Sequence, residues 1–420
     1  MKVLRYLGLA VAAAVAAFLF APLVLRQAEP PVPGGPSLEQ RFSLHTEAWK
    51  RPAREEPRWR ERRGHAYSLK DREESFPEDP RWKRLFAGLP KLRPLPGGCL
   101  ACHGATPARG LAWLEVTPYW EARRELEQPL GCPDCHDSIS VALRLTRPAF
   151  PLTPRSHQEL RALVCAQCHA DYYFAAGSMR VAYPWTRGLK LEDIEAHYDA
   201  AGFSDFVHAG TGAALLKAQH PQYEMWSQGV HARSGVTCAD CHMPLARQGA
   251  VNFTDHHARS PLLNVERACL RCHSFPAEEM KVRVKTIQDR TTALLDRALA
   301  ALVELLDEPA RARGVETARD HSLTLVARKP AAVFAPPYRA ATVRERSASG
   351  NFAGLSETAR RLHRQAQFRA DFVAADGSKG FHAPQEALRL LAEALDLARQ
   401  AAIRGQATQS PNSPAREHLP

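Results

Sequence analysis

The sequence repeats one short motif five times, and these copies use every cysteine in the chain. Each copy is Cys-x-x-Cys-His, and all ten cysteines of the 420 residues belong to one of them. Two thiols three residues apart can each add to a vinyl group of one porphyrin, while the adjacent imidazole reaches the iron. The motif therefore predicts five covalently attached c-type haems, held by Cys99, Cys102, His103, Cys132, Cys135, His136, Cys165, Cys168, His169, Cys238, Cys241, His242, Cys269, Cys272 and His273.

Paired cysteines also occur in zinc ribbons, in disulfides and in redox-active Cys-x-x-Cys sites. None of these explains a histidine directly after every second cysteine. The haem interpretation accounts for all five histidines at once.

Haems supply apolar bulk that side chains otherwise provide. Only 8% of the residues are aromatic and 24% are charged. We therefore expect a mainly α multihaem cytochrome c fold with the five haems in its core. Helices are predicted at 278–306, 355–373 and 384–403, where apolar residues recur at helical spacing. They could form a bundle, lie at a dimer interface or simply cover the haems.

The N-terminus carries an apolar, uncharged segment from Tyr6 to Leu25, preceded by Lys2 and Arg5. This pattern predicts an export signal, consistent with haem attachment outside the cytoplasm. A cleaved signal peptide and a retained membrane anchor both fit, because the segment is long enough to span a bilayer. We expect a periplasmic protein, or one on the outer face of the cytoplasmic membrane.

The formal net charge of +11 favours anionic ligands or acidic partners. Nucleic acid is the other common partner of a basic protein, but haem and export argue against it.

Histidines outside the motifs are numerous enough to give every iron a second ligand, since thirteen of the eighteen remain. Counting therefore cannot distinguish an electron carrier from an enzyme. The motifs begin 33, 33, 73 and 31 residues apart, so the long third gap must hold something additional. It contains polar residues among apolar neighbours, at 171–174, 216–221 and 229–231.

At these positions the sequence resembles the pentahaem cytochrome c nitrite reductases that form ammonium. The matching segments are Cys165–Phe174, Leu216–Pro221, Gly229–His231, Val236–Pro244, Thr254–His256, Gly380–His382, Glu386–Arg389 and Arg63–His65. The resemblance spans His65 to Arg399 and is most specific from Cys165 to His273.

The resemblance implies a role for each matching residue. The haem at Cys99 would be catalytic, with Tyr172 and His220 lining its distal side. Calcium would bind beside it, and the other four haems would each have a distal histidine. The implied calcium ligands are Asp171, Tyr172, Lys217 and Gln219, and the implied distal ligands are His256 for the second haem, His65 for the third, His382 for the fourth and His231 for the fifth.

Three departures from the family pattern stand out. Many members have a lysine where this chain has His103, although a histidine-ended first motif also occurs in the family. Asp171 replaces the usual glutamate at the calcium site. The family's active-site arginine aligns with Pro77 from one side and with Arg81 or Arg84 from the other.

The resemblance implies an oxidoreductase that reduces nitrite to ammonium with six electrons, receives them from a quinol-oxidising membrane cytochrome or another donor, and forms a homodimer. Two alternatives stay open: a reductase of hydroxylamine or sulfite with the same architecture, and a non-catalytic electron-transfer cytochrome.

The expected organisation follows from these assignments. Residues 1–28 form the signal peptide or anchor, 29–60 a linker and N-terminal extension, and 61–275 the pentahaem catalytic core. Residues 276–405 form the long-helix region, which supplies His382 and a dimer interface, and 406–420 form a disordered tail.

Overall fold

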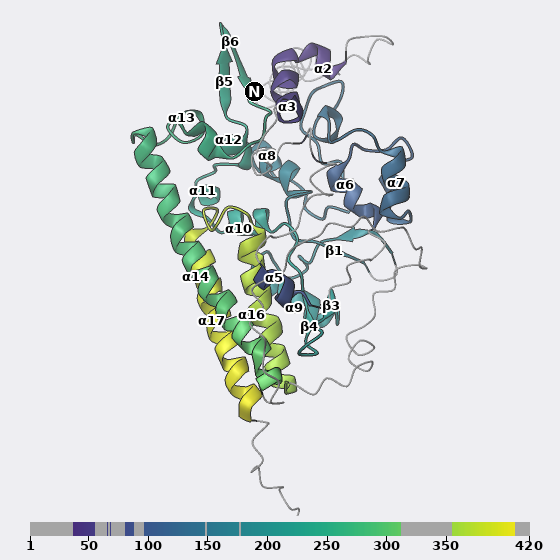
Figure 1. The fold of residues 1–420 in the computed structure, drawn as a ribbon. Coiled ribbons are helices and arrows are strands. Elements are labelled where there is room, and N and C mark those ends of the chain that lie inside the picture. Colours follow the sequence, from purple (N-terminus) through teal and green to yellow (C-terminus); the bar gives the residue numbers. More distant parts are fainter. Residues whose placement is uncertain are drawn as a thin grey trace, which may run out of the picture.

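The computed structural model describes residues 37–54, 65, 68, 80–87, 96–147, 149–175, 178–311 and 355–407. Within these ranges the protein is mainly helical, with a few very short strands, as the sequence predicts. Three long helices lie along one side, and the motif-bearing segments form the rest from short helices and loops (Figure 1).

The three long helices are α14 (Ala277–Arg311), α16 (Glu357–Ala375) and α17 (Pro384–Ala407). All three predictions from apolar periodicity are confirmed, with ends that differ by at most five residues. They pack on one another as a bundle through buried faces, because their apolar residues recur every three to four positions. The shared cluster includes Leu299, Leu302, Ala366, Ala394 and Ala398.

A second apolar cluster joins the bundle to the motif-bearing region. Phe368 and Phe372 of α16 pack with Ile194 of α9 (Leu191–Ala200) and with Leu216. Arg369 crosses the same interface, where Nη1 lies 3.1 Å from Oε2 of the buried Glu195. The bundle is therefore fixed to the segment that carries the candidate distal residues.

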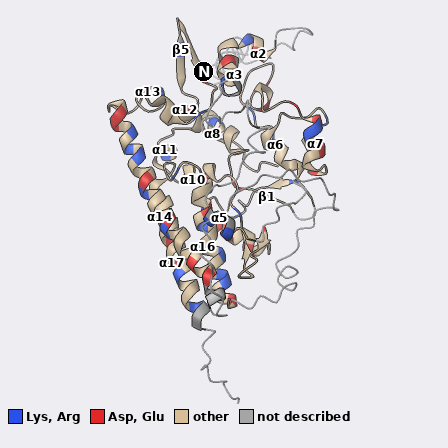
Figure 2. Cartoon of the chain, in the orientation of Figure 1, with Lys and Arg blue, Asp and Glu red and all other residues tan. Residues whose placement is uncertain are grey.

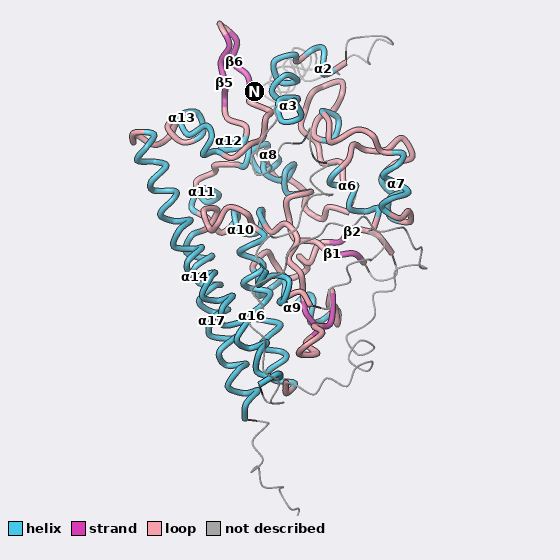
Figure 3. The backbone as a smooth tube through the Cα atoms, in the orientation of Figure 1, coloured by secondary structure: helices cyan, strands magenta, loops and turns pink. Residues whose placement is uncertain are grey.

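The motif-bearing region has no long helix in its described parts (Figure 3). Its apolar side chains form separate small clusters beside the motifs rather than one continuous core. This is the arrangement expected where porphyrins occupy the interior. Its helices are η2 (Gly97–Cys99), α6 (Leu100–His103), η3 (Leu111–Glu115), α7 (Tyr119–Glu125), η4 (Cys132–Asp134), α8 (His157–Ala166), α10 (Gln222–Ser227), α11 (Val230–Arg233), α12 (Cys238–His242), η5 (Pro261–Asn264) and α13 (Val265–Ala268).

The described strands form three antiparallel hairpins. β1 (Tyr173–Phe174) pairs with β2 (Val181–Ala182), with Tyr173 opposite Ala182. β3 (Phe206–Val207) pairs with β4 (Ala214–Leu215), and β5 (Leu245–Gln248) pairs with β6 (Val251–Thr254). The first hairpin follows Tyr172 directly and the third leads into His256.

Two helices lie in the stretch assigned above to a linker and N-terminal extension. They are α2 (Leu38–Arg41), whose N-terminus is capped by the Ser37 side chain, and α3 (Ser43–Arg54). His45 of α3 packs edge-on against His256, with 5.0 Å between ring centres. A further short helix, α5 (Pro80–Leu85), packs on α14 through Leu85.

No helix among the described residues is long and apolar enough to cross a membrane. The predicted export segment, residues 6–25, lies outside those residues, as does nearly all of the predicted tail; α17 extends to Ala407. Positive and negative side chains alternate along α14 and α17 (Figure 2), as expected for solvent-exposed helical faces.

Candidate haem centres and active site

Each motif is built as a single tight turn of chain. The backbone N–H of the motif histidine donates to the carbonyl of the first cysteine, at 2.9 Å for His136 and Cys132 and at 2.9 Å for His169 and Cys165. In such a turn, residues three and four apart lie on one side. The two thiols and the imidazole of each motif can therefore meet the same porphyrin.

Four of the five motif histidines lie opposite the distal histidine that the resemblance implies. The distances between ring centres are closely similar in all four pairs. They are 6.3 Å for His136 and His256, 6.4 Å for His65 and His169, 6.4 Å for His242 and His382, and 6.2 Å for His231 and His273.

This spacing fits a metal ion between the two rings. A metal–imidazole nitrogen bond is about 2.0 Å, and the ring centre lies about 1.1 Å behind that nitrogen, so two axial imidazoles place their centres about 6.2 Å apart. The histidine pairs therefore suit the two faces of one haem iron.

Hydrogen bonds orient several of these rings with the second nitrogen toward the partner ring. Nδ1 of His136 donates to the carbonyl of Val141 at 2.8 Å, and Nδ1 of His242 donates to that of Arg259 at 3.1 Å. On the distal side, His256 Nδ1 donates to the Thr254 carbonyl at 2.9 Å. Such bonds fix the tautomer that leaves Nε2 available for iron.

Burial favours the neutral form, which is the form that binds a metal, at several of these imidazoles. It lowers the pKa of His169 to about 3, and lowers those of His242 and His256 to about 4. His382 differs, because the Asp376 carboxylate outweighs burial and raises its pKa.

The first motif has a different distal side. His103 donates from Nδ1 to the carbonyl of Ser68 at 3.0 Å. His220 lies opposite, with ring centres 6.3 Å apart, and Tyr172 stacks on His220 at 6.3 Å. Phe174 packs edge-on against Tyr172 at 5.6 Å. The structure thus brings together the two residues that the resemblance assigns to a substrate pocket.

The predicted calcium residues also lie together. Oδ1 of Asp171 accepts from the backbone N–H of Gln219 at 2.8 Å, and the Gln219 side chain donates to the carbonyl of Lys217 at 3.3 Å. The Lys217 ammonium points elsewhere, to Asp371 at 3.0 Å. Lysine can therefore serve the cluster through its carbonyl only.

The cluster contains buried carboxylates whose negative charge the neighbouring groups do not fully neutralise. Burial raises the pKa of Asp171 to about 7, with Asp205 adding to the shift. Glu224 accepts from the Asp171 backbone N–H at 2.8 Å with one oxygen, while its other oxygen is buried without a hydrogen-bond partner. Oxygen ligands with surplus negative charge suit a calcium ion. No group of three or more His, Cys, Asp or Glu side chains with metal-binding geometry occurs in the described ranges.

The two candidate arginines lie on α5 and face the helical bundle. Arg81 pairs with Asp296 at 2.6 Å and Arg84 pairs with Asp307, both on α14. Pro77 lies outside the described residues. The ion pairs give both guanidiniums a structural partner, so neither is assigned to substrate.

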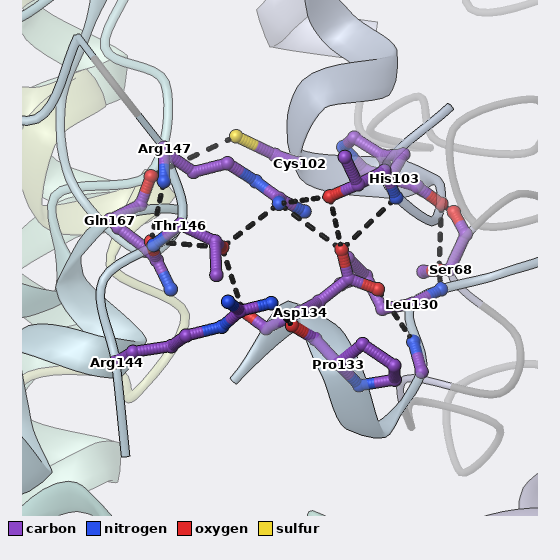
Figure 4. Close-up of polar contacts among 12 residues, drawn as sticks. Ser68, Cys102, His103, Leu130, Pro133, Asp134, Arg144, Thr146, Arg147 and Gln167 are labelled. Atoms are coloured by element: carbon purple, nitrogen blue, oxygen red, sulfur yellow. Dashed lines mark hydrogen bonds and ion pairs between the residues drawn. The ribbon is translucent and has the colours of Figure 1, made fainter. Parts of the chain in front are cut away.

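A different arginine is buried between the first three motifs (Figure 4). Nη1 of Arg147 lies 3.1 Å from Oδ1 of Asp134, and each side chain is only 4% exposed. Thr106 and Thr146 also contact this nitrogen, at 3.1 and 3.0 Å. Sequence analysis missed this pair, because nothing distinguishes Arg147 from the many exposed arginines.

Motif thiols from successive centres contact one another. Cys102 hydrogen-bonds Cys168, which joins the first and third motifs, and Cys165 hydrogen-bonds Cys238, which joins the third and fourth. In the haem-bearing protein these sulfurs are thioethers. The contacts place the first, third and fourth motifs next to one another in that order.

The second and fifth motifs extend this chain. Cys135 of the second motif lies close enough to Cys168 of the third to interact electrostatically. Cys241 of the fourth motif does so with Cys269 of the fifth. The fourth motif therefore lies between the third and the fifth.

Comparison with known proteins agrees with this architecture. Cytochrome c-552 of Parabacteroides distasonis is 32% identical over 358 residues, and that of Bacteroides fragilis is 35% identical over 358 residues. Each alignment covers 81% of this chain and 64% of the relative, so the chain spans less than two thirds of their length.

A solved structure is also similar. The cytochrome c nitrite reductase of Desulfovibrio desulfuricans, described as a catalytic subunit with two calcium sites, superimposes with a TM-score of 0.60 at 26% identity. The match covers 82% of this chain and 71% of that one. The cytochrome c552 family model matches residues 57–413, which include all five motifs. The chain therefore belongs to the cytochrome c552 family and carries c-type haems.

Proposed function

We propose that this protein is an ammonium-forming nitrite reductase, with the first haem as its catalytic centre. One observation carries the assignment. The other four motif histidines each face one histidine, whereas His103 faces a stacked pair, His220 and Tyr172. Family membership and the similar nitrite reductase structure support it.

The distal pair can perform the acid–base part of this reaction. Conversion of nitrite to ammonium consumes six electrons and eight protons, and both oxygen atoms leave as water. The His220 imidazole and the Tyr172 hydroxyl can donate hydrogen bonds to a nitrite oxygen and pass protons to it. Such positioned acids contribute about 10²- to 10⁴-fold in rate. An iron with an open face supplies the site where nitrite binds and electrons arrive.

Electron supply follows the order of the motif contacts. The chain's own residues hold the third centre against the first, through Cys168 and Cys102, and the fourth against the third. Four bis-histidine centres can therefore refill one catalytic centre without large movement. We infer an exported enzyme that receives electrons from a quinol-oxidising membrane cytochrome or a similar donor, and that works as a homodimer.

The calcium site would stiffen the distal pocket. Asp171, Lys217 and Gln219 flank Tyr172 and His220 in sequence, so an ion bound to them fixes both catalytic side chains. Removing calcium with a chelator should lower turnover, and added Ca²⁺ should restore it. If the protein as isolated contains no calcium and a chelator leaves turnover unchanged, the calcium site is wrong while the catalytic assignment stands.

The direct test is ammonium production from nitrite by the reduced protein. Tyr172→Phe and His220→Gln should each lower kcat by about 10²-fold or more, the low end of a general-acid contribution. Tyr173→Phe is the matched control, because the Tyr173 hydroxyl contacts His197 at 3.1 Å rather than His220. Assays with hydroxylamine and sulfite distinguish the alternative substrates. Protein that reduces either one while leaving nitrite untouched would refute the proposal.

A second candidate function has a specific observation in its favour. The 6.3 Å between His103 and His220 lies within the 6.2–6.4 Å range of the four axial pairs. A substrate can bind the first iron only if the His220 ring lies to the side of the axial position. If the ring lies at that position, His220 would be the sixth ligand of the iron. In that case the protein would be a five-haem electron-transfer cytochrome without a catalytic iron.

A further inference from the structure

The distal histidine of the fourth haem has a carboxylate partner. Nδ1 of His382 donates to Oδ1 of Asp376 at 2.5 Å, and the Asp376 side chain is fully buried. Where the structure shows an Nδ1 bond for another axial histidine, at His103, His136 and His256 for example, the acceptor is a neutral backbone carbonyl. The fourth haem is thus set apart by a full negative charge behind one axial ligand.

The loop between α16 and α17 holds this carboxylate in place. Asp376 follows the last residue of α16, and the Ser378 hydroxyl donates to its second oxygen while accepting from the backbone N–H of His382 at 3.1 Å. Gly380 has φ +83°, and a Cβ there would meet Thr291 at 2.4 Å. Close packing of the loop leaves Asp376 little freedom to leave His382.

We propose that Asp376 sets the reduction potential of the fourth haem, lowering it by hydrogen-bonding His382. The inference rests on the assignment of His382 as an axial ligand made under the proposed function. Adding one electron converts ferric to ferrous iron and removes one positive charge from the centre. A carboxylate on the ligand stabilises the more positive ferric state and gives the imidazole greater basicity, so reduction becomes less favourable.

The position of the fourth haem gives this effect a consequence for electron flow. Its motif contacts the third through Cys238 and Cys165 and approaches the fifth through Cys241 and Cys269. A lowered potential at this position makes electron transfer from the fifth haem to the fourth less favourable and transfer from the fourth to the third more favourable. Asp376 therefore acts as a positioning residue for the relay, through His382.

Redox titration of the intact haem-bearing protein, followed by magnetic circular dichroism, tests the proposal. Asp376→Asn keeps an acceptor oxygen for His382 and removes the charge, so one of the five midpoint potentials should rise. Ser378→Ala removes a donor to Asp376, leaves the carboxylate more basic and should shift the same potential down. Asp396→Asn is the matched control: Asp396 is exposed on α17, where Gln400 contacts it, and all five potentials should stay unchanged.

The outcomes separate this inference from the assignment beneath it. If Asp376→Asn and Ser378→Ala both keep the same numbers of low-spin and high-spin haems and the same five midpoint potentials as the wild type, the tuning role is overturned. His382→Ala should convert one low-spin haem to high-spin. If it does not, His382 is not an axial ligand, and the inference fails with that assignment. If Asp376→Asn does not fold, Ser378→Ala still tests the proposal. An upward shift of the potential, or no shift, in Ser378→Ala would contradict it.

Discussion

The ring centres of His103 and His220 lie 6.3 Å apart, the same distance that separates His136 from His256. In both pairs a motif histidine faces a second imidazole across a space that a porphyrin can occupy. The first pair differs because Tyr172 stacks on the distal ring. The proposed activity requires His220 to serve substrate at this position, whereas His256 serves iron.

His256→Ala should convert the second haem from low-spin to high-spin and leave the other haems as they are. The reason is local, because the Thr254 carbonyl holds His256, and His136 is the motif histidine that its ring faces. Electron paramagnetic resonance of the oxidised protein measures the change. His157→Ala, at an exposed position on α8, should give the wild-type spectrum. An unchanged spectrum in His256→Ala would show that another side chain binds this iron.

Arg147→Met should lower the free energy of unfolding by about 3–5 kcal/mol, because it leaves the buried Asp134 charge without its partner. Urea unfolding of the haem-bearing protein measures the loss. Arg144 offers a matched comparison, since its pair with Asp137 is exposed and 3.9 Å long. Arg144→Met should cost at most about 1 kcal/mol. Equal effects of the two substitutions would contradict the importance given to burial.

Gly229→Ala should disturb two of the proposed haem ligands at once. A Cβ at Gly229 would lie 2.0 Å from the carbonyl oxygen of His382, and Gly229 begins the helix that carries His231. We expect lower thermal stability and partial loss of low-spin character at the fourth and fifth haems. Gly210→Ala is the control, because its added Cβ would approach the His208 ring no closer than 3.4 Å. A stable Gly229→Ala protein with intact low-spin signals would count against this close approach.

Glu195 should make the protein less stable as pH rises. Burial raises its pKa above the ordinary value of 4.5 despite Arg369 nearby. Below pH 4.5 the Glu195 carboxyl is protonated in both the folded and the unfolded protein. As pH rises, the unfolded chain ionises first, so the contribution of Glu195 is lost through the interval up to its raised pKa. The difference in unfolding free energy between wild type and Glu195→Gln should therefore shrink as pH rises from 4 to 8. Glu357→Gln, which removes an exposed carboxylate, should show no such trend. If this difference in unfolding free energy instead grew with pH, the raised pKa of Glu195 would be contradicted.

The sequence predicted those features that depend on local patterns. Five Cys-x-x-Cys-His motifs indicated the haems, and helical periodicity located α14, α16 and α17 to within a few residues. The partners of His136 and His242 came from the family resemblance, because no spacing rule relates residues more than a hundred positions apart. The structure brings the implied pairs together at axial spacing, and ligation itself remains a prediction.

Other features could not be seen in the sequence because they depend on burial and on distant contacts. Arg147 is one of many arginines, and only the fold shows that Asp134 neutralises it in the interior. Asp376 lies six residues before His382, yet its role requires a loop that turns it back onto the ring. The helices α2 and α3 were missed because α2 has only four residues and α3 contains Pro52, which argues against a helix, and packing near His256 defines one of them.

The most direct test of the central claim is the spin state of the five haems in the oxidised, nitrite-free protein. We predict one high-spin ferric haem with an open axial position and four low-spin haems, measured by electron paramagnetic resonance and magnetic circular dichroism. Nitrite should convert the high-spin signal to low-spin. Five low-spin haems that do not respond to nitrite would show that His220 binds the first iron, and would contradict the proposed nitrite reductase.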